Sequence, residues 1–163
     1  NSKPPVSQKS KRESTPNGRT YFLPDGTSVI DFFETANKST SFHEFGHHIQ
    51  NLDGTMRKVT RGTGADSAQV RLELQADCYA GVVFNQVMKD SNSPIKAVTK
   101  DDLLRIADAA RSVGDDHIQK QQGGFVNPES WTHGSSEQRQ RWLSVGFDSG
   151  NPSSCNTFDT QDL

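Results

Sequence analysis

Long apolar runs are absent from this chain of 163 residues, of which 31% are hydrophobic. No stretch approaches the roughly 18 consecutive apolar residues that span a bilayer, so no membrane-spanning segment is predicted. The first residue is Asn1 rather than methionine. We therefore expect a processed chain from which a signal sequence or N-terminal anchor was removed, and such an anchor would allow membrane association.

A concentration of positive charge on the folded part is also absent. The formal net charge is −2, but residues 1–20 alone carry +4, which leaves about −6 for the remainder. Because nucleic-acid binding needs a basic patch on the fold itself, no nucleic-acid partner is expected. Prolines and serines accompany the charges of residues 1–20, which predicts a basic, disordered tail or linker.

Cysteine is scarce as well. Two cysteines, Cys78 and Cys155, allow at most one bridge, which excludes a scaffold built on several disulfides. A bridge requires the C-terminal segment to fold back on the segment that carries Cys78. The alternative is that Cys78 is a buried small apolar residue and Cys155 a free thiol. We favour the bridge, which an export compartment would promote.

Hydrophobic periodicity predicts four helices. The most regular pattern covers residues 67–89, where apolar residues recur at four-residue steps on a wide stripe. Further helices are predicted over 31–52, 99–114 and 135–146, the last opened by a capping box. Residues 53–66 contain three glycines and no periodicity, which predicts a loop.

Two short apolar segments before the first predicted helix indicate a small β-hairpin. Residues 21–23 and 28–30 flank the sequence Pro-Asp-Gly-Thr at 24–27, which suits a tight turn. We therefore expect one predominantly helical α+β domain over residues 21–158, followed by a C-terminal tail over 159–163.

The strongest chemical motif is His43-Glu44-Phe45-Gly46-His47, an HExxH sequence. On a helix, His43 and His47 share one face and can bind one metal ion. Zinc lowers the pKa of its bound water toward ~7 and polarises a substrate carbonyl. Glu44 is placed to take the proton of that water and deliver it to the leaving amine. The alternatives are a capping box that uses Glu44 and ordinary half-buried histidines.

A catalytic zinc site also needs a third protein ligand. Glu73 and Asp77 lie four residues apart on the most regular predicted helix, where unpaired carboxylates would be costly among apolar neighbours. We predict that Glu73 binds the metal and that Asp77 accepts a hydrogen bond from a ligand imidazole. His133 and His117 remain alternative third ligands.

His133 has a second predicted role. It lies in the loop Trp-Thr-His-Gly just before the last predicted helix, where it could donate a hydrogen bond to the oxyanion formed on the scissile carbonyl. The alternative is an ordinary surface histidine.

Together these segments resemble the bacterial putative neutral zinc metallopeptidase family. The resemblance covers roughly residues 21–158 and rests on several blocks in the family's order: HEFGHHIQNLDG, VRLELQADCYAG, GDDHIQ, THGSSEQRQRW and CNTF. Two features depart from the family pattern. The segment between the predicted hairpin and the HExxH helix is short, and a cysteine expected near Leu23 is absent.

The resemblance implies a zincin-like, gluzincin-like arrangement of sites. His43, His47 and Glu73 would bind one Zn²⁺ per chain, Glu44 would act as general base, and Asp77 would support a ligand histidine.

The predicted function is therefore zinc-dependent hydrolysis of peptide bonds in a peptide or protein substrate, by an extracytoplasmic enzyme that is secreted or membrane-anchored. Two alternatives stay open. One is a zinc-bound binding or regulatory module with a degenerate cleft, which the short segment before the HExxH helix motivates. The other is a zinc hydrolase of non-peptide amides, because the metal chemistry is the same for any amide.

Overall fold

The computed structural model describes residues 14–15, 18–22, 28–31, 38–91 and 100–163. The helices in this part of the chain are α1 (Lys38–Leu52), α2 (Thr55–Lys58), α3 (Ala68–Lys89), α4 (Lys100–Ser112), α5 (Asp115–Gln121) and α6 (Ser136–Ser149). The other described elements are the short 3₁₀ helices η1 (Pro128–Ser130) and η2 (Pro152–Ser154) and the strands β1 (Ser14–Thr15), β2 (Gly18–Phe22) and β3 (Ser28–Asp31).

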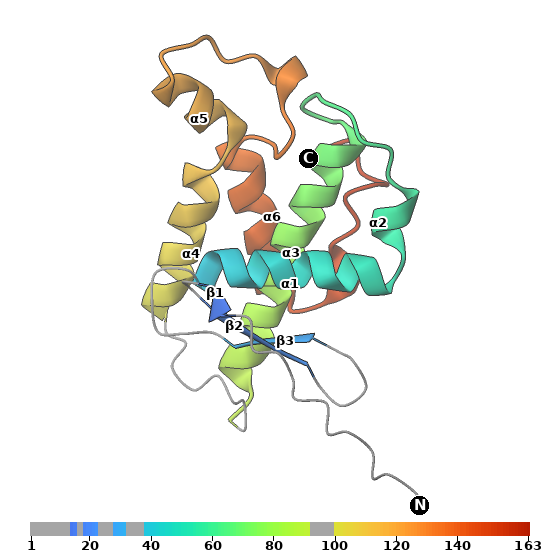
Figure 1. The fold of residues 1–163 in the computed structure, drawn as a ribbon, viewed down its shortest axis with the longest axis vertical. Coiled ribbons are helices and arrows are strands. Elements are labelled where there is room, and N and C mark those ends of the chain that lie inside the picture. Colours follow the sequence, from blue (N-terminus) through green and yellow to red (C-terminus); the bar gives the residue numbers. More distant parts are fainter. Residues whose placement is uncertain (1–13, 16–17, 23–27, 32–37, 92–99) are drawn as a thin grey trace, which may run out of the picture.

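Helix α3 is the centre of the fold, and its most extensive contacts are with α6 and α1 (Figure 1). Its wide apolar stripe leaves it buried on nearly every side, and all residues from 72 to 82 are buried. Ser67 caps the helix by accepting a hydrogen bond from the backbone N–H of Val70. The helix predicted over 67–89 is confirmed.

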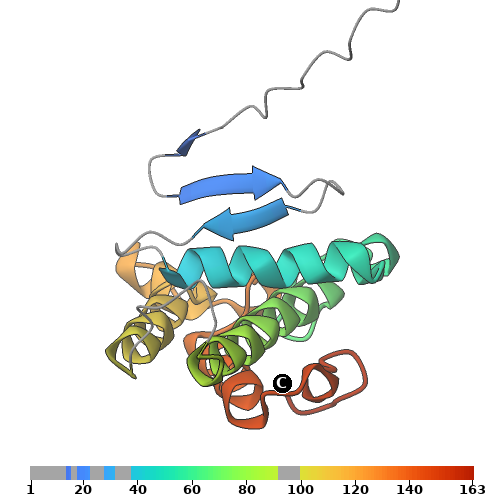
Figure 2. The same cartoon turned by 90° about the horizontal axis from the view of Figure 1, so that it is seen from below.

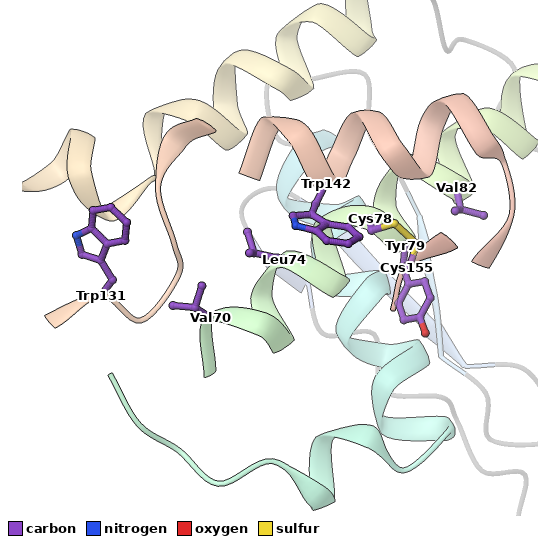
Figure 3. Packing of buried hydrophobic residues seen from close by; sticks show 8 residues of the cluster. All are labelled: Val70, Leu74, Cys78, Tyr79, Val82, Trp131, Trp142 and Cys155. Carbon is purple, nitrogen blue, oxygen red and sulfur yellow. A yellow bond between two sulfur atoms is a disulfide. The ribbon is translucent and has the colours of Figure 1, made fainter. Parts of the chain in front are cut away.

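Two hydrophobic clusters surround α3. One cluster consists of Val70, Leu74, Cys78, Tyr79, Val82, Trp131, Trp142 and Cys155 (Figure 3). The other packs α3 against α1, α4 and α6 through Phe42, Ala80, Phe84, Ile106, Ala110 and Leu143. The α3–α6 contact depends on Gly146, because a Cβ at this position would collide with the backbone carbonyl of Cys78.

The C-terminal segment folds back over α3. A disulfide joins Cys78 on α3 to Cys155, the pairing that the sequence favoured. Beyond it, Arg71 donates a hydrogen bond to the carbonyl of Thr160 at 2.7 Å, and Leu163 packs against the first cluster. Thr160 and Leu163, within the predicted tail 159–163, thus contact the domain.

The α+β class predicted from the sequence is wrong, and the domain is helical. Strand β2 pairs antiparallel with β3, with Tyr21 opposite Val29, and β1 pairs with β2. The strands lie outside α1 (Figure 2), and within the described ranges none of their extensive contacts is with a helix. Since a mixed class requires sheet and helices to share a core, a β-hairpin is not a layer of this fold. The predicted turn at 24–27 lies outside the described residues.

Other boundaries differ in smaller ways. The last helix starts as predicted, with a capping box between Ser135 and Gln138. The sequence missed α2 and α5, because each is short and polar and offers no apolar periodicity. Most of the predicted N-terminal tail, residues 1–13 and 16–17, lies outside the described residues. In the part of the chain that the structure describes, no helix is long and apolar enough to cross a membrane.

Candidate metal centre

The crossing of α1 and α3 builds the centre of the site (Figure 1). At Gly46 a Cβ would collide with the backbone carbonyl of Ala76, so only glycine allows α1 to approach α3 this closely. Gly46 lies between the two histidines of the motif, and Ala76 lies between Glu73 and Asp77. The close approach therefore brings the HExxH residues onto the acidic face of α3.

Three side chains converge at the crossing. Nε2 of His43 lies 3.1 Å and Nε2 of His47 lies 3.4 Å from the same oxygen, Oε2 of Glu73. Zinc bonds of about 2.0–2.1 Å in a tetrahedron separate ligand atoms by about 3.3 Å, so the observed spacing suits one zinc ion. Potential ligand atoms of the three residues all lie within 4.8 Å of one another.

The electrostatics of the three groups also favour a cation. Burial alone would lower the pKa of His43, but the charge of Asp77 and the hydrogen bonds to Asp77 and Glu73 raise it to about 9. Burial alone would raise the pKa of Glu73, but the two histidines hold it well below its usual value. The site therefore attracts positive charge, which protons or a metal ion can supply.

Asp77 holds the first histidine in place. Its Oδ1 lies 2.7 Å from Nδ1 of His43, and its side chain is almost completely buried. The guanidinium of Arg139 on α6 donates to both carboxylate oxygens of Asp77, at 2.8 and 2.9 Å. Burial alone would raise the pKa of Asp77, but Arg139 and His43 lower it. Asp77 is thus a buried carboxylate that accepts a hydrogen bond from Nδ1–H of His43 and directs Nε2 toward Glu73.

Gln50 performs the same task for the second histidine. Its Oε1 lies 2.8 Å from Nδ1 of His47, and its side chain is completely buried. Its Nε2 donates to the carbonyl of Leu72 at 2.7 Å and to Oε1 of Gln75 at 3.0 Å. Gln75 in turn donates to the carbonyl of the disulfide residue Cys155. A buried chain of hydrogen bonds therefore connects His47 to the disulfide.

Sequence reasoning missed both Arg139 and Gln50. Gln50 left a weak signal, since it lies three residues after His47 on the same helix and its polar side chain faces the core. Arg139 left none, because its partner Asp77 is 62 residues away in the sequence.

Glu44 differs from the residues around it. Its side chain is exposed, and among the described residues it has no hydrogen-bond partner. It lines a cavity of about 670 Å³ together with His43, His47 and Glu73. Ser41, the residue that would pair with Glu44 in a capping box, lies inside α1 rather than at its start. Glu44 is therefore free to act on a molecule in the cavity.

A further cavity adjoins the candidate ligands His43, His47 and Glu73, called the metal-ligand group below. A second cavity of about 300 Å³ shares Glu44, His47 and Glu73 as lining residues. Residues of α4 line the first cavity but not the second, whereas Met56 and Arg61 line only the second. Together the two cavities extend to both sides of the candidate metal centre.

The two alternative third ligands lie apart from this group. His133 lines the larger cavity, and its half-exposed side chain has Nδ1 3.4 Å from Oδ1 of Asp115. His117 lines neither cavity, and its Nε2 lies 3.0 Å from Nε2 of Gln121. Within the described ranges, Glu73 is the third member of the group that could hold a metal.

Comparisons with known proteins agree with this geometry. The model of the family described as "Putative neutral zinc metallopeptidase" matches residues 33–158. An uncharacterized protein of Mycobacterium tuberculosis, Rv2575, is 45% identical over 127 residues, which cover 74% of this chain and 43% of the relative. The uncharacterized protein YpfJ of Escherichia coli K12 is 43% identical over 122 residues, which cover 71% of this chain and 41% of the relative. The match thus spans about two fifths of each relative. No solved structure matches the chain significantly.

Proposed function

Because the chain belongs to the putative neutral zinc metallopeptidase family, we propose that it hydrolyses peptide bonds with one zinc ion held by His43, His47 and Glu73. One observation carries this proposal. The three potential ligand atoms lie close together on residues that line one cavity, and Glu44, whose carboxylate has no partner among the described residues, lines the same cavity. We propose the same zinc-dependent peptidase activity for the longer relatives, of which this chain matches about two fifths.

The bound zinc ion would lower the pKa of a water molecule and polarise the carbonyl of the substrate. Glu44 accepts a proton from the attacking water and returns it to the leaving amine. Asp77 and Gln50 accept hydrogen bonds from the Nδ1–H groups of the two histidines and so keep both Nε2 lone pairs directed at one point. His133 donates a hydrogen bond to the oxyanion that forms on the scissile carbonyl.

We also propose that the protein acts outside the cytoplasm. The support is the disulfide between Cys78 and Cys155, since disulfides persist mainly in oxidising compartments.

The test is to measure zinc content and peptide turnover in wild type and in Glu44→Gln. We expect one zinc per chain in both proteins and turnover lower by about 10²–10⁴-fold in the variant, the usual contribution of a general base. A matched control is Glu129→Gln, at an exposed glutamate in η1 that lines neither cavity, and it should leave turnover unchanged.

Each result separates the alternatives. Full activity of Glu44→Gln would overturn the proposed role of this residue. Bound zinc without cleavage of a diverse peptide library would support a binding module, and turnover only on non-peptide amides would support the other hydrolase. Glu73→Ala should lose both zinc and turnover, and zinc retained by that variant would overturn the assignment of the third ligand.

A further inference from the structure

The lining of the larger cavity contains two chemically different sets of residues. The polar set consists of the metal-ligand group and Glu44 together with Asp77, Ser112, His133 and Arg139. Apart from Ala80, the apolar set, called the apolar wall below, consists of Ile106, Ala109, Ala110, Val113, Ile118 and Leu143. The first three of these residues lie on α4 and Val113 follows that helix, whereas Ile118 lies on α5 and Leu143 on α6. The cavity volume of about 670 Å³ is within the range of ligand-binding pockets, roughly 300–1,000 Å³.

Part of this apolar wall is open to water. Ile106 and Ala110 are buried and belong to the cluster that joins α4 to α3, so the backbone behind the wall is firmly held. Val113 remains 44% exposed beside the polar groups of the site. Covering this apolar area with a ligand side chain is favourable because it removes apolar surface from water.

We propose that this wall, the apolar subsite, binds a large apolar side chain, such as Leu, Phe or Met, from the residue next to the scissile bond. This inference rests on the proposed peptidase function and adds a substrate class to it. The smaller cavity is lined by Met56, Val59 and Leu72 as well as by polar residues such as Arg61 and Gln69. The proposed preference therefore concerns only the side chain that enters the larger cavity.

The experiment compares two substitutions of exposed apolar residues by asparagine. Val113→Asn changes the apolar subsite, whereas Leu104→Asn changes a 57% exposed residue of α4 that does not line the cavity. Both proteins are profiled with peptides that differ only in one residue beside the scissile bond. In wild type, kcat/KM should favour Leu over Ser, and Val113→Asn should reduce this ratio by about tenfold, as expected for a changed hydrophobic pocket. Leu104→Asn should leave the ratio unchanged.

A second variant tests size rather than polarity. Ala109→Leu narrows the cavity without adding charge, so it should reject Phe while still accepting Ala. Equal use of polar and apolar residues by wild type, or unchanged ratios in Val113→Asn and Ala109→Leu, would overturn the subsite.

Binding measurements separate this inference from the proposed function. The zinc-loaded Glu44→Gln protein is titrated with the same fluorescently labelled peptides, and fluorescence anisotropy reports affinity without turnover. Tighter binding of the Leu peptide in a protein whose wild type cleaves nothing would support the subsite and reject the peptidase. Cleavage with no preference for apolar residues would support the peptidase and reject the subsite.

Discussion

The two sides of the site are held by different kinds of interaction. On the α1–α3 side, the side chains of Asp77 and Gln50 orient the two histidines, and they are 3% and 0% exposed. On the loop side, the carboxylate of Asp115 binds three backbone N–H groups and leaves the His133 side chain half exposed. The metal-ligand side is thus fixed by buried side chains, and the other side by a loop wrapped around a carboxylate.

The difference teaches where each side is vulnerable. A buried polar network must be complete, because a partner removed from it leaves a desolvated group without compensation. A loop held by backbone hydrogen bonds near the surface loses less stability when one partner is removed, since water can replace that partner. We therefore expect substitutions on the α1–α3 side to affect stability and metal binding more than substitutions on the loop side.

The largest effect is expected from Arg139→Met. This change leaves the buried carboxylate of Asp77 without its bidentate partner and should cost about 3–5 kcal/mol in the free energy of unfolding. Urea unfolding of the metal-free protein measures it. The control is Arg141→Met, on the same helix as Arg139, which breaks the exposed pair with Asp162 and should have no measurable effect. Equal stability of the two variants would contradict the importance of the buried pair.

Removal of the disulfide should have the next largest effect. The bridge closes a loop of 77 residues, and the Cys78→Ala/Cys155→Ala double variant should lose about 2–5 kcal/mol in the free energy of unfolding. Reduction of the disulfide in wild type should lower the midpoint temperature of thermal unfolding to a similar extent as the double substitution. Because Gln75 donates to the carbonyl of Cys155, zinc affinity should also fall. Unchanged zinc affinity would show that the hydrogen-bond chain does not transmit the loss to His47.

Gln50→Met tests this chain from its other end. The variant keeps the volume of the side chain but removes the acceptor for Nδ1 of His47, so zinc affinity should fall about 10–100-fold. Competition with a chelator measures the affinity. Gln86→Met is the control, since Gln86 is an exposed α3 residue that donates to the carbonyl of Gly150. Equal zinc affinities in the two variants would contradict the role of Gln50 in orienting His47.

The smallest effect on stability is expected from Asp116, which follows Asp115 on the loop side and whose contribution disappears in acid. Partial burial would raise the pKa of Asp116, but hydrogen bonds from the backbone N–H and hydroxyl of Ser136 lower it. Because the folded-state pKa is depressed, the stabilisation is present above the unfolded value of 3.8 and disappears as the pH falls through the folded value.

Thermal unfolding of Asp116→Asn measures this contribution. Near pH 6 the variant should melt below wild type by no more than about 4 °C, and the two curves should converge at lower pH. A gap that stays constant into strong acid would contradict the assignment to the charge of Asp116.

Prediction from the sequence worked best where local spacing carries the information. Residues four apart on a helix share a face, so the spacing alone pairs His43 with His47 and Glu73 with Asp77. The helix 67–89 and the capping box at Ser135 are confirmed for the same reason. The prediction of an α+β class failed because strand pairing does not reveal whether a sheet shares the core of the helices.

The sequence by itself determined that His43 and His47 share one helix face and that Glu73 and Asp77 share another, because helix geometry converts spacing into direction. It left His133 and His117 as alternatives to Glu73. Only the tertiary structure decided that the two helices cross at Gly46, that Arg139 neutralises Asp77 and that His133 lines the same cavity as Glu44. The reason is physical. Spacing determines neighbours within one helix, whereas contacts between helices depend on the packing of side chains and on the close backbone approach that glycine permits.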